Sequence, residues 1–229
     1  MPTQKRKVAV LDIDGTIFRS SLLIELTWEL IRLGIFPAVV KENLNQSYKR
    51  WRQRKGSYEN YITQVVKVFM RRVSGCQMED IITASRTVIR DQKNEVYVYT
   101  RNLIKKLKNE DYFLLAISGS PIEIVHLFGK RYSFDLVLGS QLEIKDGIYT
   151  GGIVSKPVDD KKKALLQVVE KDGLSLHGSI GVGDTESDVS FLELVTNPIC
   201  FNPNRGLLDI ARTRGWPVVV ERKDVIYEM

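Results

Sequence analysis

Cysteine is scarce in this sequence of 229 residues, and so are long uninterrupted apolar runs. The two cysteines, Cys76 and Cys200, are too few for a disulfide framework, and neither belongs to a C-x-x-C pair. The basic start of the chain leads into an apolar run that Asp12 and Asp14 interrupt, which excludes a secretory signal. The most apolar long segment, 22–40, contains several charged residues and a proline, so a membrane span is not expected. We therefore expect a soluble protein of a reducing, cytoplasmic compartment.

Acidic residues are few in one part of the chain. Between Lys41 and Arg72 there are nine basic residues and two acidic ones, so this segment has a net charge of +7, whereas the whole chain has +6. The overall composition, 43% hydrophobic and 27% charged, is ordinary for a globular protein. The length suits one large domain, or a core domain that carries a smaller inserted one.

Hydrophobic periodicity divides the chain into three parts. Residues 7–13 predict a short buried strand. Helices are then expected at 22–33, 39–54, 58–73 and 78–90. Further strands are expected at 112–118, 134–139, 179–182, 199–201 and 217–220, alternating with helices at 122–130, 161–171, 189–194 and 207–214, and a hairpin is expected at 142–151 around Asp146-Gly147. The pattern predicts an α/β fold with a parallel sheet, interrupted after its first strand by a helical insertion.

Two aspartates lie at the carboxyl end of the first expected strand. Asp12 and Asp14 lie in the sequence D-I-D-G-T, and the carboxyl end of a strand faces the ligand crevice of an open α/β sheet. Residues two apart on a strand point the same way, so both carboxylates can address one site. Because the two charges repel each other, the pair needs a cation or a proton between them. A hydrogen-bonded Asp-Gly turn is the purely structural alternative.

A small polar turn, Ser118-Gly119-Ser120, is expected directly after the apolar residues 113–117 and before Pro121. A hydroxyl and backbone N–H groups at a strand-to-helix turn can form an anion site. Serine and proline are also common first residues of helices, so this signal is weak by itself.

Three lysines, Lys161, Lys162 and Lys163, open the helix expected at 161–171. Basic residues at a helix start oppose the helix dipole, and most of this run is expected to be a solvated turn. One lysine directed at a phosphoryl group would account for the unfavourable placement.

Two more aspartates, Asp184 and Asp188, stand on the loop after the strand expected at 179–182. Carboxylates at the end of a strand suit Mg²⁺, which takes hard oxygen ligands and usually retains water. A plain helix N-cap is the alternative role for Asp188.

These four stretches all lie at the carboxyl end of an expected strand or at the start of the next helix, so one crevice can collect them. Together they supply a candidate nucleophile, a second carboxylate, a hydroxyl, a lysine and metal ligands. Phosphoryl transfer needs such groups for positioning, for neutralising the phosphoryl oxygens and for handling the proton of the leaving group.

In these motifs the sequence resembles the haloacid-dehalogenase-like hydrolase superfamily, and within it the phosphoserine-phosphatase-like branch. The matching residues are Asp12, Asp14, Thr16, Ser118, Lys161, Asp184 and Asp188. Lys162 and Lys163 are near rivals of Lys161 for the position of the family lysine. The resemblance implies a Rossmann-like three-layer core, formed by residues 1–19 and 91–229, and an inserted all-helical cap domain, formed by residues 20–90.

The resemblance also implies a role for each catalytic residue in a phosphomonoester hydrolase. Asp12 would attack phosphorus and form an aspartyl-phosphate, and Asp14 would protonate the departing alcohol and then activate water. Ser118, Gly119 and Lys161 would hold the phosphoryl oxygens.

Magnesium is the cofactor that the resemblance implies. Asp12, the backbone carbonyl of Asp14, and Asp184 would hold the ion, with Asp188 as a further ligand or as support outside the ligand set.

The substrate is expected to be a small phosphorylated metabolite. In phosphoserine phosphatases a glutamate that binds the substrate ammonium stands nine positions after the nucleophile. This chain has Ser21 there, and Glu25 lies one helical turn further on. L-phosphoserine is therefore not the expected substrate, although a phosphoserine phosphatase proper is an alternative. The basic segment 41–72 favours an additional negative charge on the substrate, unless it is only a solvated helix face.

A protein that only binds is the rival from another class. Tyr48 and Trp51 lie among the basic residues of segment 41–72, which also permits a nucleic-acid or anionic-lipid surface. Such a protein would not need the complete set of Asp12, Asp14, Lys161 and Asp184.

Overall fold

The computed structural model describes residues 5–229, so the first four residues of the predicted core segment 1–19 lie outside it. Its strands are β1 (Lys7–Leu11), β2 (Phe113–Pro121), β3 (Leu136–Lys145), β4 (Ile148–Ser155), β5 (Ser175–Gly183), β6 (Asn197–Phe201), β7 (Val218–Arg222) and β8 (Val225–Glu228). Over these residues they form one eight-stranded sheet in the order β4-β3-β2-β1-β5-β6-β7-β8. The six inner strands, β3, β2, β1, β5, β6 and β7, run parallel, and the edge strands β4 and β8 are antiparallel to their neighbours. This confirms the predicted α/β fold with a mostly parallel sheet.

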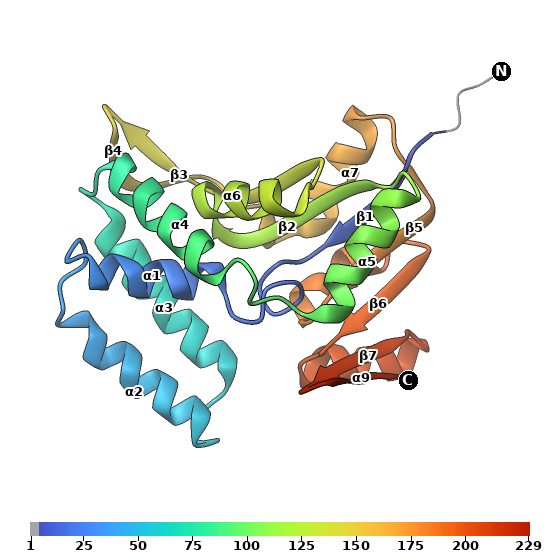
Figure 1. Ribbon diagram of the computed structural model, residues 1–229, viewed down its shortest axis with the longest axis horizontal. Helices are drawn as coiled ribbons and strands as arrows, with labels where there is room; N and C mark the ends of the chain where they lie inside the picture. Colours follow the sequence, from blue (N-terminus) through green and yellow to red (C-terminus); the bar gives the residue numbers. More distant parts are fainter. Residues whose placement is uncertain (1–4) are drawn as a thin grey trace.

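Helices cover both faces of the sheet. They are α1 (Leu22–Arg32), α2 (Val40–Arg52), α3 (Tyr58–Val73), α4 (Met78–Gln92), α5 (Val98–Asn109), α6 (Ile122–Tyr132), α7 (Lys161–Lys171), α8 (Val189–Leu192) and α9 (Arg205–Arg214). Figure 1 shows α5 and α6 in front of the sheet, and α7 and α9 behind it. The result is the three-layer, Rossmann-like arrangement that the sequence predicts.

The central strand β1 shows why two layers of helices are needed. Successive side chains of a strand point to opposite faces. Accordingly Ala9 and Leu11 lie in the core cluster that includes α5 and α6, whereas Val8 and Val10 lie in the cluster that includes α7, α8 and α9. All four side chains are fully buried, as the uninterrupted apolar run of β1 predicts.

The helices α1 to α4 form a unit that we call the helical insertion. It lies at the lower left of the molecule in Figure 1, beside the sheet and not on one of its faces. Each helix turns an apolar stripe inward, as α3 does by burying Tyr61, Val65, Phe69 and Val73 at intervals of four residues. The boundaries at residues 20 and 90 stay a prediction.

The two chain segments that connect the insertion to the core lie side by side. Phe18 forms an isolated antiparallel bridge with Val96, and the amide of Arg19 donates a hydrogen bond to the carbonyl of Glu95 (2.8 Å). The entering and the leaving segment of the insertion are therefore paired by backbone hydrogen bonds next to the core.

A third connection joins the insertion to the β3–β4 hairpin. The amide of Gly75, between α3 and α4, donates to the carbonyl of Tyr149 in β4 (2.8 Å), and the amide of Tyr149 donates to the carbonyl of Cys76 (3.0 Å). These are backbone hydrogen bonds, so they fix the position of the α3–α4 connection against the core.

Several elements differ from the prediction. Helix α5 and strand β8 were not predicted, and the segments expected at 134–139 and 142–144 are parts of one continuous strand, β3. The predicted hairpin turn is correct: Asp146 and Gly147 have φ angles of 51° and 77°, which suit a tight two-residue turn. No helix within residues 5–229 is long and apolar enough to cross a membrane.

Candidate active site

The carboxyl ends of three neighbouring strands bring the predicted site residues together. β1 pairs in parallel with β2 on one side and with β5 on the other, so the loops after these strands meet at one edge. The loop after β1 carries Asp12 and Asp14, the last part of β2 carries Ser118, and the loop after β5 carries Asp184 and Asp188.

Lys161 is the centre of the buried charges. As the first residue of α7 it is 1% exposed, and its Nζ lies 2.5 Å from Oδ1 of Asp12 and 2.6 Å from Oδ1 of Asp188. Burial alone would lower the pKa of the Lys161 ammonium, but the two carboxylates outweigh that effect and raise it. Lys162 and Lys163 are exposed, so Lys161 is the one of the three lysines that reaches these carboxylates.

Asp188 is held on both of its oxygens. While Oδ1 faces Lys161, Oδ2 accepts hydrogen bonds from the amides of Asp184 (3.0 Å) and Thr185 (3.1 Å). The side chain is fully buried. Of the two roles predicted for Asp188, this geometry favours support from outside a ligand set, because neither oxygen lacks a protein partner.

Asp184 lies against the backbone of the first loop. Its Oδ1 accepts a hydrogen bond from the hydroxyl of Thr16 (3.3 Å). A Cβ atom added to Gly15 would collide with Oδ2 of Asp184, and Gly15 has a φ of 83°, which favours glycine. The glycine of the D-x-D-G-T motif thus allows the carboxylate to approach the main chain after Asp14.

Asp14 is surrounded by hydrogen-bond donors. Ser118 Oγ donates to Oδ2 (2.5 Å), and the amide of Leu22 donates to Oδ1 (2.6 Å). Ser120 Oγ lies 3.1 Å from Oδ1 and 3.0 Å from Oδ2. Gly119 completes the same turn, and its carbonyl accepts a hydrogen bond from Ser140 (2.8 Å). A site at the end of β1 therefore also includes the first residue of α1.

The buried carboxylates fit a divalent cation. Burial, opposed by Lys161 and reinforced by repulsion from Asp188 and Asp14, raises the pKa of Asp12 to about 8. Burial and repulsion from Asp12 also raise the pKa of Asp184 well above its ordinary value. Such carboxylates take up a proton unless a cation replaces it.

No cluster of three or more His, Cys, Asp or Glu side chains that could hold a metal occurs in residues 5–229. Mg²⁺ does not require such a cluster, because it is usually bound by one or two carboxylates together with waters and substrate oxygens. Asp12, Asp184 and the main-chain carbonyl of Asp14 are hard oxygen donors of that kind.

Two residues near the site were not assigned roles from the sequence. Ser120 contacts Asp14 directly, and its only sequence signal is its place two residues after Ser118. Tyr58 is the first residue of α3. Burial raises the pKa of its phenol, and the charges of Asp14 and Asp184 raise it further, so this side chain of the insertion lies within electrostatic reach of the site.

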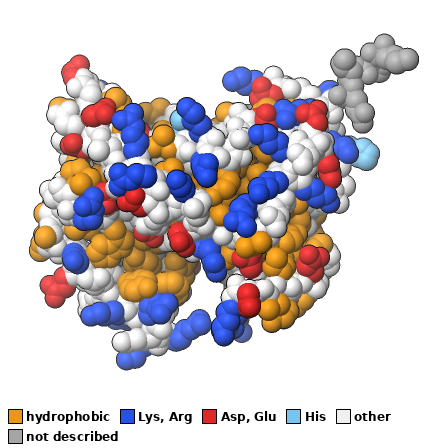
Figure 2. Space-filling view, viewed as in Figure 1, with side chains coloured by type: hydrophobic (Ala, Val, Ile, Leu, Met, Phe, Trp, Pro, Cys, Tyr) orange, Lys and Arg blue, Asp and Glu red, His pale blue; other side chains and the backbone are white. Residues whose placement is uncertain are grey.

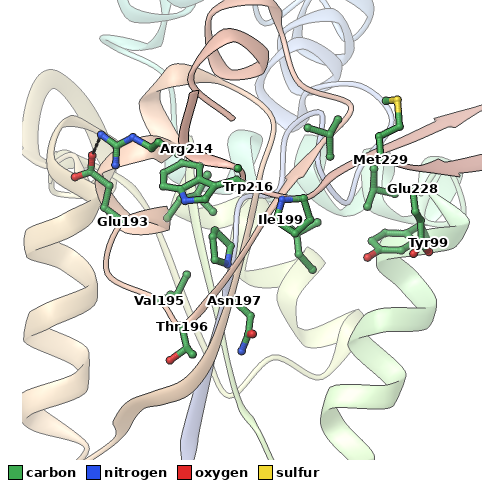
Figure 3. Close-up of a pocket in the computed structure, with 16 residues that line it drawn as sticks. Tyr99, Glu193, Val195, Thr196, Asn197, Ile199, Arg214, Trp216, Glu228 and Met229 are labelled. Atoms are coloured by element: carbon green, nitrogen blue, oxygen red, sulfur yellow. Dashed lines mark ion pairs between the residues drawn. The ribbon is translucent and has the colours of Figure 1, made fainter. Parts of the chain in front are cut away.

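A separate hollow of about 640 Å³ lies at the opposite edge of the sheet. It is formed by the first residues of β6 and β7 and by the ends of α8 and α9, and Figure 3 shows the ion pair of Arg214 with Glu193 on its wall (2.5 Å). Arg214 also lies over the ring of Trp216. None of the predicted site residues lines this hollow.

The chain is similar in sequence to known bacterial phosphatases. A phosphoserine phosphatase of Mycobacterium tuberculosis is 28% identical over 127 residues, which are 55% of this chain and 41% of that protein. The chain thus matches less than half of the length of that relative. A histidinol-phosphatase of Neisseria meningitidis is 24% identical over 228 residues, which cover 93% of this chain and 98% of that protein.

The fold is shared with a solved structure of a phosphoserine phosphatase that holds an analogue of the phospho-aspartyl intermediate. The TM-score is 0.64 at 21% identity, with 96% of each chain covered. A sequence model of the haloacid dehalogenase-like hydrolases matches residues 9–193, most of the chain and all of the predicted site residues. The chain therefore belongs to the haloacid dehalogenase-like hydrolase family.

Proposed function

We propose that this protein is a Mg²⁺-dependent phosphomonoester hydrolase that acts through an aspartyl-phosphate on Asp12. The observation that carries the proposal is the buried Asp12–Lys161–Asp188 arrangement beside Asp14. A buried lysine at 2.5 Å orients Asp12 and places positive charge where phosphoryl oxygens would gather. A purely structural cluster would not need a second carboxylate, Asp14, held in place by hydroxyls of another loop.

The proposed reaction has two steps. An oxygen of Asp12 attacks phosphorus, the bond to the leaving oxygen breaks, and Asp14 gives a proton to the departing alcohol. Asp14 then takes a proton from water, which attacks the aspartyl-phosphate and releases inorganic phosphate. Ser118, Gly119 and Lys161 would bind the phosphoryl oxygens in both steps.

Asp12, Asp184 and the carbonyl of Asp14 would hold Mg²⁺, and Asp188 would orient the loop of Asp184. The ion would neutralise charge on the phosphoryl group.

The proposed substrate is a small anionic phosphomonoester, with residues 20–90 acting as a cap domain over the site. In Figure 2, Lys and Arg side chains stand on both sides of the gap between the helical insertion and the β6–β8 side of the core. All nine basic residues between Lys41 and Arg72 are exposed, so their charge acts on the approach of a substrate from solvent.

L-phosphoserine fits the residues around the site less well than an anionic ester does. Ser21, which stands where the glutamate that binds ammonium is expected, is only 3% exposed. Glu25 accepts hydrogen bonds from Ser20 (2.7 Å) on one oxygen and from Gln92 (2.7 Å) on the other. Glu25 therefore already has one partner just before α1 and another at the end of α4, and binding a substrate ammonium would require it to leave them.

A nucleic-acid surface is less well supported than an enzyme. Base stacking requires exposed aromatic faces, but Trp51 packs against Tyr58 (5.1 Å between ring centroids) and stacks on the buried Tyr61 (6.0 Å). Trp51 thus contributes to the packing of the insertion, whereas Tyr48 and Tyr58 are 39% and 37% exposed.

The proposal is tested by a screen of phosphomonoesters with Mg²⁺ and with excess chelator. The screen should include p-nitrophenyl phosphate, L-phosphoserine and histidinol phosphate. The last two are included because the similar proteins are named as a phosphoserine phosphatase and a histidinol-phosphatase. We expect turnover that requires Mg²⁺, with an anionic ester preferred to L-phosphoserine. Full activity in excess chelator would contradict the metal assignment, and L-phosphoserine as the best substrate would contradict the assignment of substrate class.

A further inference from the structure

We propose that Ser120 is a positioning residue for Asp14, which holds the proton-transferring carboxylate and connects it to the first turn of the helical insertion. This inference rests on the proposed function. Ser120 is 1% exposed, and its Oγ lies about equally far from both oxygens of Asp14, at 3.1 Å and 3.0 Å. Its amide also donates to Ser118 Oγ (2.9 Å), so the two serines and the aspartate form one connected group.

The direction of the hydrogen bonds assigns the proton of Ser120. The amide of Leu23 donates to Ser120 Oγ (3.0 Å), so this oxygen is an acceptor toward the insertion. A hydroxyl has one proton, and that of Ser120 is therefore directed to Asp14. Ser120 thus links the amide of Leu23 to the carboxylate of Asp14, so that a shift of Leu23 would shift the carboxylate.

The start of α1 explains why this contact matters. The first amides of a helix have no acceptor within the helix, and the N-cap residue Ser21 does not supply one from its side chain. The amides of Leu22 and Leu23 instead donate to Asp14 and to Ser120. The proposed acid and its neighbour therefore cap the first helix of the insertion, and the orientation of Asp14 depends on where that helix lies.

Ser118 and Ser120 contribute differently when substrate is bound. The proposed role of Ser118 is to bind a phosphoryl oxygen, and its single proton cannot serve that oxygen and Asp14 at once. Ser120 and the Leu22 amide would then be the groups that keep Asp14 aligned with the leaving oxygen. Loss of Ser120 should hence affect proton transfer, and loss of Ser118 should affect phosphoryl binding.

Two esters of similar shape separate these effects. General acid help contributes about 10²–10⁴-fold, and a good leaving group needs it least. We expect Ser120→Ala to lower kcat for phenyl phosphate by about 10–100-fold and kcat for p-nitrophenyl phosphate by less than about threefold. Ser118→Ala should lower both rates alike. Ser120→Cys, which keeps the side-chain size and has only a weak donor, should show the same selectivity as Ser120→Ala and is the variant to use if the alanine protein is unstable.

Thr27→Val is the matched control, because it removes another buried hydroxyl that contacts the same turn of α1, by donating to the carbonyl of Leu23 (2.7 Å), without contacting Asp14. It should change the two rates by the same factor. An equal loss of both rates in Ser120→Ala, or no loss of either, would overturn the role of Ser120. Absence of turnover in the unsubstituted protein would instead overturn the phosphatase assignment, and the role of Ser120 with it.

Discussion

Charged side chains are buried at the carboxyl edge of the sheet, whereas the basic side chains of the helical insertion are exposed to solvent. At the sheet edge, Asp12, Lys161 and Asp188 are buried, and an oxygen of each carboxylate lies within 2.6 Å of the Lys161 ammonium. In the insertion, the nine basic residues between Lys41 and Arg72 are exposed. A buried charge requires a specific partner, because desolvation is costly without one, whereas an exposed charge is screened by solvent. Single substitutions should therefore have large effects at the sheet edge and small ones on the insertion.

The largest effect is expected at Asp12. Asp12→Asn should lower turnover of p-nitrophenyl phosphate by at least about 10⁴-fold and abolish phosphoenzyme formation, because it removes the nucleophile. Steady-state rates and acid-quenched labelling with a phosphate-labelled ester measure the two quantities. Asp172→Asn, at an exposed residue after α7, should leave both unchanged. Normal turnover in Asp12→Asn would contradict the mechanism.

Lys161 should come next. Lys161→Met should lower kcat by about 10²–10³-fold, because it removes a cation directed at the reacting phosphoryl group. Lys162→Met removes the same charge from the exposed neighbour and should change kcat by less than about twofold. Comparing kcat for the two proteins is the test, and a defect confined to Lys162 would show that the family lysine was aligned one residue too early.

Magnesium should stabilise the folded protein in a pH-dependent way. Without a cation, the pKa of Asp12 is about 8 instead of the ordinary 3.8, so its contribution to stability is fully present below pH 3.8 and is lost as the pH rises through about 8. Mg²⁺ replaces the proton. At a hundred times its Kd it should add about 2.7 kcal/mol, which corresponds to roughly 5–10 °C in Tm.

Thermal unfolding with and without Mg²⁺ measures this effect. The increase in Tm should be larger at a pH above about 8 than at a pH of about 6, where protons compete with the ion. Asp12→Asn should show a smaller increase and a weaker dependence on pH. An increase that is the same at both pH values in the unsubstituted protein would argue against binding at these carboxylates.

The smallest effect is expected on the insertion. Replacing Arg52 and Arg54 by serine should raise KM for an anionic ester by about threefold at low ionic strength and by less at high salt. These residues lie near Tyr58, the end of α3 that approaches the site. Replacing Arg71 and Arg72, about 20 Å away at the other end of α3, removes the same charge and should change KM less. Equal effects of the two pairs would indicate that only the total charge of the insertion matters.

The same contrast limits what the sequence can predict. Asp12, Ser118 and Asp184 could be predicted because each lies at or just after the end of a strand whose apolar run is clear, and because parallel strands bring their ends to one edge. Lys161 could be predicted from its place at the start of a helix and from the family resemblance. The four helices of the insertion could be predicted from their apolar stripes, as in α3. How the insertion lies relative to the site could not be predicted, since it depends on contacts between distant residues, such as the hydrogen bond of Leu23 with Ser120.

The missed elements have local reasons. Helix α5 buries Thr100, Ile104 and Leu107, but one of these three is polar and basic residues stand between them, so its apolar stripe is short. Strand β8 is fully exposed and has no buried face to produce an alternating pattern. Strand β3 was divided because polar residues interrupt its apolar run where it extends beyond β2 to pair with β4.

The backbone bonds between the β3–β4 hairpin and the α3–α4 connection also bear on mechanics. A helical insertion joined to its core only through two adjacent chain segments could pivot about that single attachment. This one is anchored at a second, distant point, where Gly75 and Cys76 bond to Tyr149. Together with the hydrogen bonds from the amides of Leu22 and Leu23 to Asp14 and Ser120, the two attachments restrict how far the insertion can move relative to the catalytic edge.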